Sequence, residues 1–348
     1  MFFTSDNCGP MHPNVRAAVL AADEGFMPSY GDDPIMDVVR GQIRDLFGTP
    51  DASVYLVATG TAANALGLAT ITKPWETVFC TPLAHINVDE CHAPEFYTGG
   101  AKLSLVGPGD KMTPDALEKK ILSWGKGDVH TSQRGPMQIT QVTEMGRLYT
   151  LEELKALTSV ARRYGLRSFM DGARFANAVA ALGCTAREMT VEAGIDALSF
   201  GGTKNGCAGV EAVVFFEPEH AWEFELRRKR GAHLFSKHRY LSAQMQGYLA
   251  EGTWLKASAQ ANANAARLVQ GLRGVTGLEF VEEPEANMIF ATLPRHAHQT
   301  LKAGGAQYGL WGDLEGDPDE RLMMRMVCDW SMPHAMIDDF LDLARGLK

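Results

Sequence analysis

Short apolar runs alternate with longer, helix-like segments along the first two thirds of the chain. Each run is rich in β-branched and aromatic residues and too short for a helix, which is the pattern of a buried strand. The runs cover residues 53–60, 77–81, 102–107, 137–143, 166–171, 196–200 and 210–216. Because strands that alternate with helices form parallel sheets, the pattern predicts an α/β fold with a mostly parallel, seven-stranded sheet covered on both faces.

Two of the intervening segments carry helix boundary signals. Residues 113–124 open with Thr113, a favoured N-cap residue, and a proline at the first helical position. Residues 150–165 begin with a capping box formed by Thr150 and Glu153 and stop at a glycine. Both segments are therefore predicted to be helices that connect strands.

The pattern changes after about residue 216. A charged helical stretch is followed by one or two long helices over residues 239–272. Short strands are expected at 278–281, 288–293 and 322–327, with a last helix at about 333–347. We therefore divide the chain into a large α/β domain, residues 1–240, and a smaller C-terminal α+β domain, residues 241–348. No linker rich in Ser, Gly or Pro separates them, so we expect them to pack closely.

Composition narrows the class of protein. The 348 residues carry 33 basic and 42 acidic side chains, a net charge of −9, with the basic residues scattered. This speaks against nucleic-acid binding and against a membrane-surface anchor. No apolar run is long enough to span a bilayer, the N-terminus does not resemble a signal peptide, and the six cysteines form no CxxC pair. We expect a cytoplasmic protein with reduced thiols.

The candidate chemistry lies where predicted strands end, since parallel sheets bind ligands at the carboxyl ends of their strands. In "ATGTAAN", Gly60 and Thr61 stand where a strand meets a helix, and free N–H groups there can hold a phosphate, although a plain tight turn explains them too. In "MDGAR", Asp171 and Arg174 form either a local ion pair or a site where an anion faces a cationic ring nitrogen.

Lys204, in "SFGGTKNG", follows another strand and is surrounded by glycines and small residues. The segment is not a phosphate loop, which needs a wider glycine spacing and a Ser or Thr after the lysine. A lysine crowded by apolar strands loses its proton more readily, because burial disfavours the charged form. A neutral amine can attack an aldehyde and form a Schiff base. A phosphate turn, an aspartate and then a lysine is the order typical of pyridoxal 5'-phosphate (PLP) enzymes.

Longer segments support the same interpretation. They are "SDN" (5–7), "YGDDP" (30–34), "ATGTAAN" (58–64), "AHINVDECHAPEF" (84–96), "TQVTEMG" (140–146), "MDGARFANAVAALGC" (170–184), "SFGGTKNG" (199–206) and "LFSKHRYLSAQ" (234–244). With them the chain resembles the low-specificity L-threonine aldolases over nearly its whole length. The resemblance implies the PLP-dependent transferase fold of aspartate aminotransferase, fold type I.

The resemblance also implies roles for individual residues around the cofactor. Lys204 would form the imine, Asp171 would pair with the ring nitrogen, and Arg174 would lie near the phenolic oxygen of the ring. Gly60 and Thr61 would hold the phosphate. A further cation for the phosphate would come from Lys237, with Arg239 as the rival position.

His85 would stack on the ring and lie near the substrate hydroxyl, with Glu90 beside it and beside a water in the active site. From the residues alone, His85 can also be a strand-end histidine that caps the next helix, and Glu90 can be a solvated helix charge. The cluster that these two form with Asp89, Cys91 and His92 fits no standard zinc spacing, so we expect no metal ion.

The substrate carboxylate would be bound by Arg325, because a planar guanidinium suits a carboxylate through two parallel bonds. Arg321 is the rival arginine. Ser5 would also reach the carboxylate, and Tyr30 and Asp32 would serve the site in less defined roles.

The implied activity is cleavage of L-threonine, L-allo-threonine and related β-hydroxy amino acids such as phenylserine to glycine and an aldehyde. Rival interpretations are another PLP enzyme on the same scaffold, namely a β-eliminating lyase, a serine hydroxymethyl-transfer enzyme or an aminotransferase, and a non-catalytic α/β protein that binds a phosphate ligand. Enzymes of this fold build each site from two subunits, so we expect a dimer or a dimer of dimers, a homotetramer.

Overall fold

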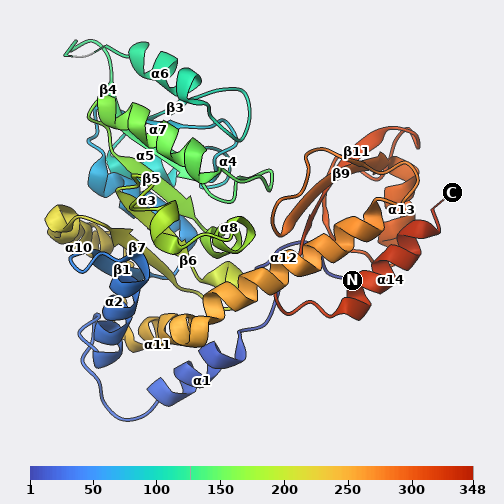
Figure 1. Cartoon of the computed structure of the whole chain (residues 1–348), viewed down its shortest axis with the longest axis horizontal. Coiled ribbons are helices and arrows are strands. Elements are labelled where there is room, and N and C mark those ends of the chain that lie inside the picture. Colours follow the sequence, from blue (N-terminus) through green and yellow to red (C-terminus); the bar gives the residue numbers. More distant parts are fainter. Residues whose placement is uncertain (126, 348) are drawn as a thin grey trace.

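A computed structural model describes residues 1–125 and 127–347. The chain forms a large α/β part and a smaller part, and the long helix α12 (Thr253–Leu272) runs from one to the other (Figure 1). This arrangement agrees with the two-part pattern of the sequence. Where the boundary between two domains falls stays a prediction.

The large part is built on a seven-stranded sheet with the order β1–β7–β6–β5–β4–β2–β3. The strands are β1 (Ser53–Val57), β2 (Glu76–Cys80), β3 (Lys102–Leu105), β4 (Gln133–Thr140), β5 (Ser168–Gly172), β6 (Ala197–Gly201) and β7 (Glu211–Phe215). Only β7 runs antiparallel to its neighbours β1 and β6. All seven predicted strands are therefore confirmed, although β4 starts four residues before the predicted residue 137, where Gln133 and Arg134 pair with β2.

Helices cover both faces of this sheet, as the apolar runs predicted (Figure 1). They are α1 (Pro13–Ala22), α2 (Pro34–Phe47), α3 (Gly60–Ile71), α4 (His85–Val88), α5 (Ala93–Thr98), α6 (Pro114–Leu122), α7 (Leu151–Arg163), α8 (Phe175–Leu182), α9 (Ala186–Met189), α10 (Ala221–Arg230) and α11 (Arg239–Leu249). The predicted cap at Thr113 and the capping box of Thr150 and Glu153 are both present.

Helix α3 carries the N-terminal turn of the candidate site and is nearly completely buried. Its small residues let it approach the sheet: a Cβ atom at Gly67 would lie 2.6 Å from the ring of Phe169 on β5. Only glycine fits at such a distance. The turn that opens α3 is therefore fixed rigidly against the strand ends.

The small part is an antiparallel sheet with the order β10–β11–β9–β8, covered by α12, α13 (Arg295–Ala303) and α14 (His334–Arg345). The strands are β8 (Glu279–Phe280), β9 (Met288–Pro294), β10 (Gly309–Trp311) and β11 (Arg321–Val327). Three of them and the last helix match the prediction. Strand β10 was missed because three residues with a glycine give no apolar alternation.

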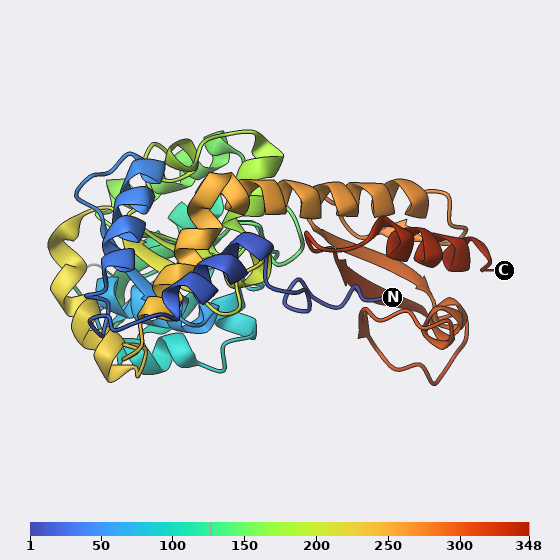
Figure 2. The ribbon, with the colours of Figure 1, turned by 90° about the horizontal axis from the view of Figure 1, so that it is seen from below.

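The N-terminal segment crosses from the large part to this second sheet (Figure 2). Phe3 donates its N–H to Gln307 O at 2.7 Å, and its carbonyl accepts from Val327 N at 2.9 Å. Its side chain lies in the apolar core of the small part. The residues that follow Phe3 are thereby placed between the two parts.

Candidate active site

A cavity of about 260 Å³ lies at the carboxyl ends of the central strands. Its lining includes five predicted site residues, Gly60, Thr61, His85, Asp171 and Lys204. They come from the end of β5, the turn after β6 and the first turns of α3 and α4, which are far apart in the sequence. The structure thus brings together five of the residues that the sequence motifs singled out.

The first turn of α3 offers backbone donors to this cavity. The Thr59 side chain caps the helix by accepting from Ala62 N at 3.2 Å, and the Thr59 carbonyl accepts from Ala63 N. The N–H groups of Gly60 and Thr61 keep no partner among the described residues. A Cβ atom at Gly60 would meet no atom within 4 Å, so the turn opens into free space. This geometry suits a phosphate group.

Asp171, at the end of β5, is almost completely buried. Its Oδ2 atom accepts from Asn64 Nδ2 at 2.9 Å, and its Oδ1 atom accepts from Ala173 N at 3.0 Å. Asn64 is in turn oriented by Ser199, whose hydroxyl donates to Asn64 Oδ1 at 2.9 Å. A buried carboxylate held in this way is suited to face a protonated ring nitrogen.

Asn64 also links Asp171 to His85 and Glu90. The same amide donates to Glu90 Oε1 at 2.8 Å, and His85 Nδ1 lies 2.7 Å from that oxygen. Sequence reasoning missed Asn64, although the only signal, a polar residue on an otherwise apolar helix, is visible in "ATGTAAN". The alternative interpretation of Glu90 as a solvated helix charge is wrong, since its side chain is buried.

The charges around His85 set its proton affinity. Burial works to lower the pKa of His85, but the hydrogen bond to Glu90 and the charge of Asp171 outweigh it and raise the pKa. Burial raises the pKa of Glu90. The ligand atoms of these three groups lie within 4.8 Å of one another, close enough for a cation. Hydrogen bonds from Asn64 already occupy both carboxylates, and the absence of a metal stays a prediction.

Lys204 sits in a single 3-10 turn, Thr203–Asn205, directly after β6. Asn205 fixes the turn by donating to the Tyr248 hydroxyl at 2.8 Å and to Trp254 O at 2.7 Å. Gly206 closes it with a φ of +102°, a conformation that other residues rarely adopt. The glycine that follows the lysine turn is therefore explained by the backbone.

Glu211 is a second residue of the cavity that sequence reasoning missed. It begins β7, and its Oε2 atom accepts from Gly202 N at 2.8 Å. Burial raises the pKa of this carboxyl to about 7, against hydrogen bonds from Thr203 and Gly202 and the charge of Lys204. Its signal in the sequence is an acidic residue inside an apolar run, "GVEAVVFF".

Arg174 pairs with Asp6, not with the neighbouring Asp171. Its Nε atom donates to Asp6 Oδ2 at 2.7 Å and its Nη2 atom to Asp6 Oδ1 at 2.9 Å, and both side chains are buried. Of the two alternatives for this motif, the local Asp171–Arg174 ion pair is therefore wrong. Asp6 also accepts from Asn287 Nδ2 at 3.0 Å, which ties the small part to this corner of the cavity.

Comparison with known proteins agrees with this geometry. The family model of beta-eliminating lyases matches residues 3–295. The chain belongs to this family. Within it, the low specificity L-threonine aldolase of a Pseudomonas strain is 38% identical over 96% of this chain and 94% of that protein, and the one of Pseudomonas aeruginosa is 36% identical over 99% and 96%.

A solved threonine aldolase of Leishmania major shares the fold of this chain. The two structures superpose with a TM-score of 0.90 at 24% identity, over 99% of this chain and 98% of that one. The predicted α/β fold of PLP-dependent type I enzymes is thereby confirmed. The family itself is PLP-dependent.

Arg321 and Arg325, both on β11, are the two candidates for binding the substrate carboxylate. Arg321 is engaged, since its Nη2 atom donates to Thr292 Oγ1 at 2.7 Å and to Gly277 O at 3.0 Å. The Nε atom of Arg325 is buried without a partner among the described residues. Burial and the charge of Arg174 lower the pKa of Arg325. Arg325 is not among the residues that line the cavity, and its binding of a carboxylate stays a prediction.

Four further predicted residues do not line the cavity within this chain, and neither do Glu90, Arg174 and Arg325. Ser5 precedes Asp6, and its hydroxyl accepts from Asn7 N at 3.1 Å. Tyr30, 46% exposed, and Lys237 lie near each other on the surface, because Tyr30 N donates to Ser236 O. Asp32 is exposed beside them. The roles expected for these four residues stay predictions.

The rival Arg239 is engaged elsewhere, since its Nη1 atom donates to Gly25 O at 3.0 Å.

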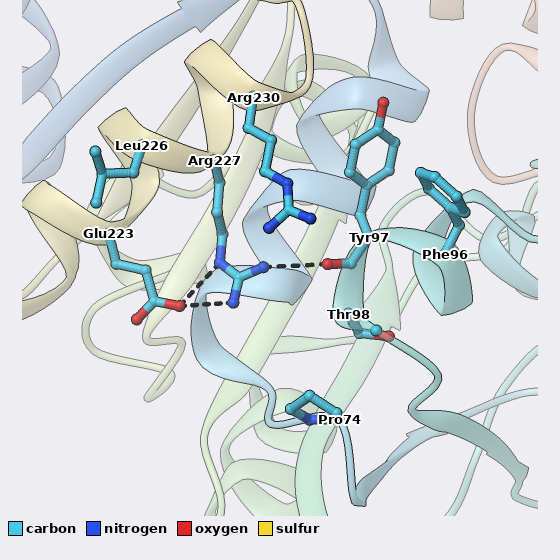
Figure 3. A pocket seen from close by; sticks show the side chains of 9 residues that line it. Pro74, Phe96, Tyr97, Thr98, Glu223, Leu226, Arg227 and Arg230 are labelled. Carbon is cyan, nitrogen blue, oxygen red and sulfur yellow. Dashed lines mark hydrogen bonds and ion pairs between the residues drawn. The ribbon is translucent and has the colours of Figure 1, made fainter.

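A larger hollow of about 600 Å³ lies away from these strand ends, between α5 and α10 (Figure 3). Arg227 points into it, but donates to Glu223 at 2.7 Å and to Tyr97 O at 3.1 Å (Figure 3). None of the residues that line this hollow also lines the smaller cavity. The smaller cavity is therefore the candidate active site of this lyase.

Proposed function

We propose that this chain cleaves L-threonine, L-allo-threonine and related β-hydroxy amino acids such as phenylserine to glycine and an aldehyde, with PLP as cofactor. The observation that supports this most is a single cavity that gathers a helix start with free N–H groups, a buried aspartate, a lysine and a histidine. The names of the two Pseudomonas relatives point to the same reaction.

The residues present fit the cofactor. Gly60 and Thr61 would hold its phosphate through the N–H groups at the start of α3, and Lys204 would bind it covalently. Asp171 would keep the ring nitrogen protonated, and the cofactor would then supply a sink for the electrons released at Cα of the substrate. Arg174 would serve near the ring, and Lys237 would supply a cation for the phosphate.

The substrate is held by its carboxylate. Arg325 offers a guanidinium whose Nε atom has no other partner among the described residues, and Ser5 assists. This contact would orient the substrate so that its Cα–Cβ bond can break. The carboxylate and the amine of the substrate are held, but the part that becomes the aldehyde is not. The enzyme therefore accepts a range of β-substituents.

His85 manages the proton of the β-hydroxyl, directly or through a water that it orients with Glu90. The hydroxyl loses its proton, the Cα–Cβ bond breaks, and the former hydroxyl oxygen becomes the carbonyl oxygen of the aldehyde. A proton then returns to Cα and glycine leaves. Glu90 stabilises the protonated form of His85 by its hydrogen bond.

The exposed Tyr30, Asp32 and Lys237 support an assembly with sites between subunits. They lie on the surface of this chain. In a dimer they would reach the cavity of the other subunit. We infer a dimer or a dimer of dimers, the homotetramer.

We also infer a cytoplasmic protein, which fits its six free thiols. Across residues 1–125 and 127–347, no helix combines the length and apolar character needed to cross a bilayer.

The test is a product assay. The purified protein is incubated with L-threonine, and acetaldehyde and glycine are expected in equal amounts. Release of a 2-oxo acid or ammonia instead would identify another PLP reaction. Borohydride treatment followed by mass spectrometry should place PLP on Lys204, and the variant Lys204→Ala should lose it. Lys256→Ala, which changes an exposed lysine of α12, serves as the matched control.

A further inference from the structure

Glu211 occupies an unusual place for a carboxyl group. It is 5% exposed and opens the antiparallel strand β7, opposite Gly201 of β6 and Val57 of β1. Its side chain lines the same cavity as Lys204. None of the steps described for substrate cleavage uses it.

The carboxylate is fixed to the turn that carries the lysine. Glu211 Oε2 accepts from the N–H of Gly202, two residues before Lys204, at 2.8 Å. Thr203, the residue between them, places its hydroxyl 3.2 Å from Val210 N. The strand before Glu211 and the turn before Lys204 are thus held as one unit.

Three titratable groups, Lys204, Cys207 and Tyr248, interact electrostatically with Glu211. Lys204 lies in the turn after β6, and its charge favours the ionised carboxylate. The Cys207 thiol on the same loop and the Tyr248 phenol of α11 feel the charge of Glu211. Burial raises the pKa of both, so they stay neutral near pH 7 and do not compete for the proton.

A neutral amide could also accept from the N–H of Gly202, without the cost of burying a charge. A carboxyl group at this position has a further property: it can exchange a proton with the amine of Lys204, which lines the same cavity. Transfer from the half-buried ammonium to the buried carboxylate replaces two charges with two neutral groups, which burial favours.

We propose that Glu211 is the positioning residue of Lys204 and its local proton acceptor. The ammonium of Lys204 gives one proton to a carboxylate oxygen of Glu211. The lone pair left on Nζ then forms a bond to an incoming carbonyl carbon, and the carbonyl oxygen leaves as water. The proposal rests on the proposed function, in which Lys204 must be a free amine to capture the cofactor as an aldehyde.

The test follows the capture of PLP by the full-length protein after its cofactor has been stripped. Borohydride is added at intervals, and mass spectrometry measures how fast mass accumulates on Lys204, from pH 5.5 to about 10. Glu211→Gln keeps an oxygen for the N–H of Gly202 and removes the titratable group. Glu217→Gln, an exposed acid just past the other end of β7, is the matched control.

In the wild type and in Glu217→Gln, the capture rate should rise through pH about 7. In Glu211→Gln the rate at pH 8 should fall by about 100-fold, and the rise should move toward the ordinary range of lysine, about pH 10. Thermal unfolding checks that the variant is folded.

An unchanged pH profile in Glu211→Gln overturns the proposal. If that variant does not fold, the wild-type profile decides alone, because a rise confined to about pH 10 also overturns it. A wild type that never carries PLP on Lys204 would instead refute the proposed function, so the two failures are distinguishable.

Discussion

The guanidinium of Arg174 binds the carboxylate of Asp6 through two hydrogen bonds, Nε to Oδ2 at 2.7 Å and Nη2 to Oδ1 at 2.9 Å. The pair is buried and joins the N-terminal segment to the large part of the molecule. Asn287, just before β9, adds a third bond to the same carboxylate. One ion pair therefore fixes the relation of three segments around the cavity.

Removing Asp6 should destabilise the protein strongly, because Arg174 would be left as an uncompensated buried charge. We expect Asp6→Ala to lower the free energy of unfolding by about 3 kcal/mol or more. The matched control is Asp338→Ala, which breaks an equally bidentate pair with Arg267 on the surface. Its loss should be below about 1 kcal/mol. Equal losses in urea unfolding would contradict this interpretation.

The same pair predicts an acid-dependent contribution to stability. Burial works to raise the pKa of Asp6, but the charges of Arg174 and Lys204 outweigh it and lower the pKa. The contribution is therefore complete above the ordinary carboxyl range, about pH 4, and is lost as the pH falls through the lowered value. The stability gap between wild type and Asp6→Asn should be constant from neutral pH to about pH 5 and shrink in stronger acid. A gap that grows in acid would refute it.

Asn64 should matter for the reaction more than for folding. It orients Asp171 and Glu90 at once, so Asn64→Ala should lower kcat by about 10- to 100-fold through misplacement of both groups. The PLP absorption band should shift in position as well, since the carboxylate facing the ring nitrogen is freed. Asn177→Ala, a buried asparagine outside the cavity that bonds Asn262, controls for the loss of a buried amide. Equal kcat values in the two variants would argue against this role.

Glu90→Gln tests whether His85 acts as the base. The bond to Glu90 raises the pKa of His85 over the opposing effect of burial, so the variant should lower it. A base must be unprotonated, and the acid limb of kcat/KM against pH should therefore move to lower pH. Aldehyde release measured between pH 5 and 9 gives the profile. An acid limb that stays in place or moves to higher pH would exclude His85 as the titrating group.

Arg325 and Arg321 should respond differently to the same substitution. Arg325→Lys loses the planar fork for the substrate carboxylate, and the KM for L-threonine should rise about 10-fold or more. Arg321→Lys changes bonds to Thr292 and Gly277 and an ion pair with Glu279 at the other end of β11, and it should leave KM near the wild-type value. Steady-state assays of both variants settle the choice, and a larger effect in Arg321→Lys would reverse the assignment.

Much of the fold was predictable because its signals are local. Apolar runs marked all seven strands of the large sheet, and caps such as Thr113 and the Thr150–Glu153 box marked helix starts. The motif residues Gly60, Asp171 and Lys204 were also predictable, since parallel strands present their carboxyl ends at one edge. Strand β10 escaped because a three-residue strand carries no pattern.

The sequence by itself determined which segments become strands and helices and which strand ends carry polar groups, because burial and capping act over a few residues. Only the tertiary structure decided which distant side chains meet. The order of strands brings Asn64 to Asp171 and Glu211 to the lysine turn, and the N-terminal crossing brings Asp6 to Arg174. Such contacts depend on how whole elements pack, and no spacing along the chain encodes them.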